Sequence, residues 1–132
     1  MTVLNALLID SMVRHPDGRV DLVGLFEDIH FPSLPSTYES LSLFVDLQFA
    51  EPERGERKAV DLVLRSPDGG EAHRTTVKFE IPTLAQYPRD TAQLDLTLFH
   101  PTFTHYGNHC IEIREQETML QRIPLRVLAL EP

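Results

Sequence analysis

Alternation of apolar and polar residues is the dominant pattern in the chain, and it is clearest over residues 40–49. In this segment every second side chain is large and apolar: Leu41, Leu43, Val45, Leu47 and Phe49. A period of two places all of them on one face of a β-strand, whereas a helix would spread them around its circumference. The segment therefore predicts a strand with one face on the core.

Seven further segments have the length and composition of strands. They cover residues 3–13, 19–31, 59–66, 73–81, 94–99, 109–115 and 119–130. Turn-rich clusters separate them, such as PDGG at 67–70, which predicts a hairpin between residues 59–66 and 73–81. The longest irregular stretch is 82–93, where one turn of helix is the alternative to a loop.

Two residues mark irregular positions within the expected strands. The apolar phase of residues 19–31 slips at Gly24, which predicts a bulge or a tight bend there. Pro124 cannot donate a hydrogen bond to a ladder, so it predicts an edge position or a bulge in the last strand.

Eight short strands with no extended helical periodicity predict an all-β fold, a single antiparallel β-sandwich of seven to nine strands. The chain has 132 residues, which suits one domain spanning residues 1–132. It has no tryptophan and one cysteine, so the core tryptophan and the disulfide of antibody domains are both missing.

Short structural motifs near both ends of the chain resemble those of an uncharacterised family of small bacterial immunoglobulin-like β-sandwich proteins. The matching positions are Gly24, Leu25, Phe26, Glu27, Pro32, Pro35, Gly107, Ile111, Pro124, Leu125 and Val127. One position departs from the pattern, because His109 stands where an aromatic residue is usual. The resemblance implies an immunoglobulin-like fold, and the family has no established activity to carry over.

Charge and cysteine content exclude several partners and compartments. Twenty acids against twelve lysines and arginines give a formal net charge of −8, which opposes binding to nucleic acid or to anionic lipid. No apolar run approaches the length of a membrane span, and no basic region precedes the apolar N-terminus as in a signal peptide. A lone cysteine favours a reducing compartment, so we expect a cytoplasmic protein.

The segment HPTFTHYGNHC, residues 100–110, raises the question of a metal site. If residues 94–115 form a hairpin centred between Thr104 and His105, His100 lies opposite His109. Two imidazoles at that spacing could share a metal. A zinc site needs at least three protein ligands, however, and this hairpin supplies two. The alternative, which the pattern favours, is a turn in which His109 hydrogen-bonds to the backbone and the other histidines are solvated.

Two other positions have a functional interpretation beside a structural one. Cys110 would be reactive only with a base or a positive field nearby, and a packed thiol is the simpler expectation. Phe44 interrupts the polar face of residues 40–49, and with Tyr38 it could form an exposed apolar interaction patch. The alternative is that a crossing loop covers Phe44.

Because no catalytic constellation is present, we expect a non-catalytic cytoplasmic binding or interaction module without a cofactor. It would pair with a protein partner or with a second copy of itself, and strand addition at an exposed edge is the physical route. The alternative function is a metal-binding protein or metal-dependent enzyme that uses His100 and His109.

Overall fold

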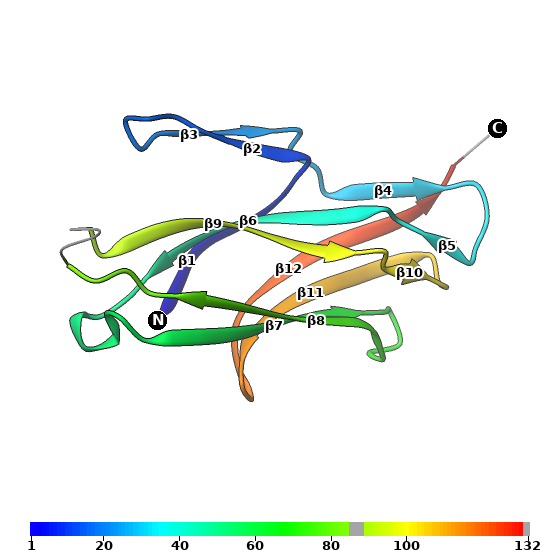
Figure 1. Cartoon of the computed structure of the whole chain (residues 1–132). Helices are drawn as coiled ribbons and strands as arrows, with labels where there is room; N and C mark the ends of the chain where they lie inside the picture. The colour runs from blue at the N-terminus through cyan, green and yellow to red at the C-terminus, as the bar shows by residue number, and fades with distance from the viewer. Residues whose placement is uncertain (85–88, 131–132) are drawn as a thin grey trace.

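The alternating segments form two main β-sheets that pack face to face (Figure 1). This computed structural model describes residues 1–84 and 89–130. The expected irregular stretch 82–93 lies partly outside the described residues. Within its described part there is no helix, and a strand already begins at Thr91.

The first sheet has three antiparallel strands in the order β1-β6-β9. Their bounds are Thr2–Ile9 for β1, Ser40–Gln48 for β6 and Thr91–Phe99 for β9. The predicted strand at 40–49 is therefore the central strand of this sheet. Its alternating leucines and valine are completely buried at Leu41, Leu43 and Val45.

The second sheet has five strands in the order β4-β12-β11-β7-β8. Their bounds are Asp28–Phe31 for β4, Thr118–Ala129 for β12, Gly107–Glu115 for β11, Arg57–Arg65 for β7 and Glu71–Glu80 for β8. The predicted hairpin between β7 and β8 is confirmed. The predicted antiparallel β-sandwich is confirmed, with one departure at an edge, where β4 pairs in parallel with β12.

Smaller elements complete the described chain. A hairpin of β2 (Ser11–Arg14) and β3 (Val20–Val23) follows β1. The two-residue strands β5 (Ser36–Thr37) and β10 (Thr102–Phe103) pair with each other. One 3-10 turn, η1, covers Glu51–Glu53. No described helix is long and apolar enough to cross a membrane.

The strand order is immunoglobulin-like. Among the seven long strands, the first, second and fifth (β1, β6 and β9) form one layer. The third, fourth, sixth and seventh (β7, β8, β11 and β12) form the other layer. In the constant-type immunoglobulin domain the fourth strand pairs with the fifth. Here β8 pairs with β7 instead, so within residues 1–84 and 89–130 β9 has a neighbouring strand on one side only.

Both sequence irregularities fall at structural breaks. The expected strand 19–31 ends at Val23 and resumes at Asp28, and Gly24 between them has φ +70°. Pro124 pairs with Cys110 on the β11 side, while β4 begins to pair only at Arg126. Pro124 therefore lies where β12 is locally an edge, as predicted.

Gly24 offers a test of this bend. A Cβ atom added at Gly24 would lie 2.1 Å from the Oδ2 atom of Asp10, whereas one added at Gly69 would meet nothing within 4 Å. Both glycines have positive φ, so alanine at either position costs about 1 kcal/mol through backbone strain. We expect Gly24→Ala to lower the free energy of unfolding clearly more than Gly69→Ala, as measured by chemical denaturation. Equal losses would contradict the steric argument.

Candidate interaction surface

The predicted hairpin through the histidine-rich segment is wrong. Leu98 pairs with Leu41 of β6, whereas Ile111 pairs with Leu64 of β7 and Ile123 of β12. The strands on either side of this segment therefore belong to different sheets, and His100 does not oppose His109. A matching apolar face could not reveal this, because every inward face of a sandwich is apolar.

His109 is a core residue, and its surroundings agree with the structural interpretation. Its side chain is 4% exposed and packs edge-on against Phe103, with ring centroids 5.4 Å apart. Nδ1 lies 3.0 Å from the carbonyl oxygen of Gly107, which can only accept, so Nδ1 carries the proton and donates. His100 and His105 are exposed. Among residues 1–84 and 89–130, no three His, Cys, Asp or Glu side chains gather as a metal site would require.

The buried position of His109 predicts a dependence of stability on pH. Burial lowers the pKa of His109 below its ordinary value near 6.5. The unfolded chain therefore binds this proton more readily, and the stability contribution is lost as the pH falls below about 6.5. We expect His109→Phe to reduce the loss of unfolding free energy between pH 7.5 and pH 5.5. The exposed control His30→Gln should keep the wild-type pH profile, and an unchanged profile in His109→Phe would contradict the assignment.

The expected exposed patch at Phe44 is not present, because Phe44 is only 8% exposed. The β2–β3 hairpin starts at the end of β1, and the side chain of Arg14 donates to the carbonyl of Gln93 on β9. Since β6 lies between these strands, the hairpin crosses its outer face, where Phe44 lies (Figure 1). Tyr38 is half-buried and packs edge-on against Phe31 instead.

A buried carboxylate on the outer face of the larger sheet was not predicted from the sequence. Glu112 accepts hydrogen bonds from Arg114 Nε at 2.9 Å and from Arg65 Nε at 3.1 Å, and Arg122 lies 3.6 Å away. These two hydrogen bonds, that of Arg114 first, lower the pKa of Glu112 to about 2 against the effect of burial.

Cys110 lies beside this cluster on the same strand. Burial raises the pKa of its thiol, so the side chain matches the packed cysteine that the sequence analysis expected.

Removal of the Glu112 charge should destabilise the sheet. Glu112→Gln removes the negative charge between the two guanidinium groups and leaves them a neutral amide oxygen, which is a weaker acceptor than a carboxylate. We therefore expect a loss of about 2 kcal/mol of unfolding free energy at pH 7. Because the folded-state pKa is depressed, the contribution is present above about 4.5 and is lost as the pH falls toward 2. The difference between variant and wild type should shrink over that range. The exposed Glu117→Gln is the control, and an equal effect of both substitutions would be evidence against the network.

The edge of β9 presents unpaired backbone groups along a regular strand. At the two ends of the β6–β9 ladder, His100 N donates to Glu39 O and Phe49 N donates to Asp90 O. The register between them is continuous, so even-numbered residues of β9 direct their N–H and C=O groups toward β6. The odd-numbered residues direct theirs away from the sheet. In agreement, the carbonyl of Gln93 accepts from Arg14 on that side.

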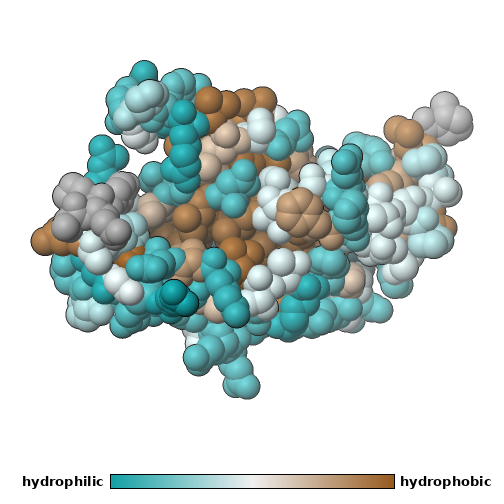
Figure 2. All heavy atoms as spheres, in the orientation of Figure 1, coloured by the Kyte–Doolittle hydropathy of each residue, from teal (hydrophilic) through white to brown (hydrophobic). Residues whose placement is uncertain are grey.

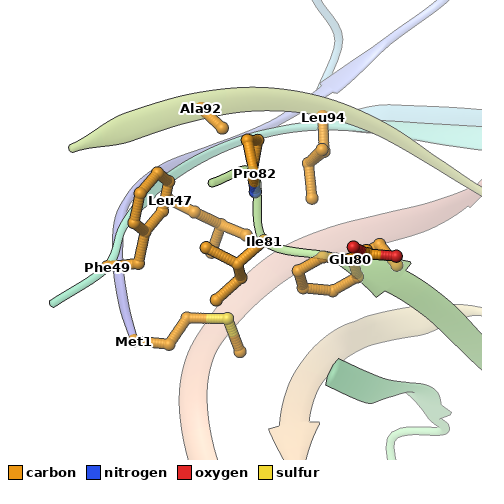
Figure 3. Close-up of a pocket in the computed structure, with 9 residues that line it drawn as sticks. Met1, Leu47, Phe49, Glu80, Ile81, Pro82, Ala92 and Leu94 are labelled. Atoms are coloured by element: carbon orange, nitrogen blue, oxygen red, sulfur yellow. The ribbon is translucent and has the colours of Figure 1, made fainter. Parts of the chain in front are cut away.

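An apolar hollow lies between this edge and the facing edge of the other sheet. Figure 2 shows apolar atoms at the centre of the face on which β8 and β9 lie. The hollow has a volume of about 90 Å³. Its lining comes from the start of the chain, the end of β6, the end of β8 and the first half of β9: Met1, Leu47, Phe49, Phe79, Glu80, Ile81, Pro82, Ala92 and Leu94 (Figure 3). Side chains of the core thus reach the surface where no strand of the described chain pairs with the outer edge of β9.

Two unpaired acids lie on the strands that flank the hollow. Asp95 on β9 and Glu80 on β8 are exposed, and neither forms an ion pair among the described residues. Beyond Asp95 on the same face of β9, Phe99 is 64% exposed. We call this region the β9 surface: the strand from Thr91 to Phe99, the hollow and Glu80. Sequence periodicity identified the strand but could not show that its edge is free.

The two packed sheets and their strand order define an immunoglobulin-like β-sandwich protein. The chain belongs to the family of unknown function DUF6941, whose model matches residues 5–128. The family resemblance expected from the motifs is therefore confirmed. No curated protein matches the chain.

Two solved structures are similar over nearly the whole chain. One is a beta-glucosidase from Listeria innocua in complex with isofagomine, with 10% identity and a TM-score of 0.46; the match covers 94% of this chain and 16% of that chain. The other is an immunoglobulin-like protein from Pseudomonas aeruginosa, with 10% identity and a TM-score of 0.40; the match covers 93% and 96% of the two chains. This chain thus spans about a sixth of the glucosidase.

Proposed function

We propose that the protein is a non-catalytic binding module that takes an extended segment of a protein partner along the free edge of β9. The observation that supports this is the row of outward N–H and C=O groups on β9 next to an apolar hollow. In strand addition, main-chain hydrogen bonds supply affinity and alternate side chains supply specificity. An added strand would also cover Leu94 and Ala92, which are partly exposed.

Comparison of the sheet edges favours β9 over the other three. Proteins protect edges with bulges, short strands or outward charges such as lysine. On β1 the pairing is irregular between Val3 and Asn5, and β4 has only four residues. On β8 the outward residues include Arg74 and Lys78. The nine-residue β9 pairs without interruption and has neither proline nor lysine.

We further propose that the module acts in a reducing compartment such as the cytoplasm. Cys110 is the only cysteine of the chain, and its thiol is free. The side chain is half-buried beside charged groups, and this position does not depend on a disulfide.

Amide hydrogen exchange tests strand addition directly. The probe is a nine-residue peptide in which valine alternates with threonine around one central lysine. We expect saturating peptide to slow exchange at Gln93, Asp95 and Thr97 by about tenfold or more, because these amides gain partners only when a strand is added. The amides of Leu94 and Leu96, already bonded to β6, are the internal control and should change little.

Backbone methylation of the peptide provides the matched control. One peptide carries N-methyl groups on alternate residues, and a second carries them on the complementary residues. Strand addition uses one edge of the peptide, so one of the two should keep its affinity and the other should lose it. If both bind equally well, or if the odd-numbered β9 amides exchange unchanged, the proposed function is wrong.

A further inference from the structure

We infer that the segment bound at the β9 surface is basic, with a lysine or arginine opposite Asp95 and an adjacent valine- to leucine-sized residue in the hollow. This inference rests on the proposed function and specifies the partner. Two observations carry it: the unpaired acids on the strands that flank the hollow, and the size and apolar lining of the hollow itself.

The charge of the partner follows from Asp95 and Glu80. Both carboxylates are exposed, and neither is paired with a cation in the described chain. Glu80 lines the hollow, whereas Asp95 follows the lining residue Leu94 on β9 and points to the outer face. In an antiparallel pair, directly opposed side chains have Cβ atoms about 4.5–5.5 Å apart, and opposite charges there contribute roughly 0.2–1 kcal/mol. A residue opposite Asp95 would point to the same outer face, where a cation stays hydrated while it pairs.

The apolar residue follows from strand alternation. The neighbour of the residue opposite Asp95 lies opposite Leu94 and points inward, toward the hollow. Figure 3 shows Leu94 and Ala92 directed from β9 toward Pro82 and Ile81 across this space. A dry cavity of about 150 Å³ accommodates benzene. The hollow has about 90 Å³, so it suits a branched aliphatic side chain better than an aromatic ring.

The same charges disfavour a second copy of this chain as the occupant. Pairing β9 with β9 of another copy would bring a second Asp95 to the edge, and each chain has a net charge of −8. Like charges on facing strands are destabilising. One positive group does reach the edge from within the chain, since Arg14 donates to the carbonyl of Gln93. An incoming strand would replace that single hydrogen bond with its own N–H.

Titration of three peptides on the alternating valine–threonine scaffold tests the inference. They carry lysine beside valine, glutamate beside valine, or lysine beside tryptophan at the central positions. We expect the lysine–valine peptide to bind about fivefold more tightly than the glutamate–valine peptide, and more tightly than the lysine–tryptophan peptide. Isothermal calorimetry gives the affinities, and exchange at Gln93, Asp95 and Thr97 verifies the site.

Two variants of the protein separate local pairing from overall charge. Asp95→Asn and Glu117→Gln each change the net charge by one, but only Asp95 lies on β9. The preference for lysine over glutamate should largely disappear in Asp95→Asn and persist in Glu117→Gln. Equal loss in both variants would overturn the pairing with Asp95.

The outcomes distinguish this inference from the proposed function. If all three peptides protect the β9 amides with equal affinity, strand addition stands and the inferred partner chemistry is wrong. If none protects them, the proposed function fails and the inference fails with it. A dimer detected by light scattering, with the odd-numbered β9 amides already protected in the free protein, would assign the edge to a second copy and overturn both.

Discussion

Burial of the apolar faces of two sheets against each other is the interaction on which the rest of the structure depends. The core consists of leucine, isoleucine, valine and phenylalanine side chains contributed by both layers, and many of them are completely buried. Each such side chain contributes roughly 1.5–3 kcal/mol when it leaves water. The sheets must therefore stay in register with each other, and any stretch of strand that lacks a covering neighbour leaves core side chains partly exposed. The position of β8 determines where this happens, because β8 extends the β7 layer and leaves β9 at an edge.

The local elements could be predicted from the sequence because their signal is local. Period-two alternation identified the central strand β6, and the PDGG turn identified the β7–β8 hairpin. The bend at Gly24 and the locally free edge at Pro124 were predicted for the same reason, since glycine and proline restrict the backbone at their own positions. These signals say which residues face a core, and burial of the alternating positions agrees with them.

The candidate surface could not be predicted, because it depends on which strands become neighbours. The prediction that His100 lies opposite His109 was wrong for this reason. Leucine on one strand and isoleucine on the next are compatible with many pairing partners, and β9 and β11 belong to different sheets. For Phe44 the pattern left an exposed patch and a covering segment as alternatives, because alternation within one strand cannot show what packs on its polar face; the side chain is in fact covered. Nothing in the sequence distinguishes Glu112 from other outward charged residues, and only the assembled sheet places Arg65 and Arg114 around it.

Charge gives the two exposed faces different roles. On the outer face of the larger sheet, Glu112 is enclosed by guanidinium groups, so its charge is satisfied within the chain and holds neighbouring strands together. At the β9 edge, Asp95 lacks a partner within the described chain, so its charge acts on whatever approaches. An unpaired acid on an open strand repels other copies of an acidic protein and thereby limits edge-to-edge association. It does so without blocking the N–H and C=O groups beside it, as a proline or a bulge would. The same residue can therefore keep the free protein apart from itself and select a basic strand, and an edge protected by charge alone is one that remains available for binding.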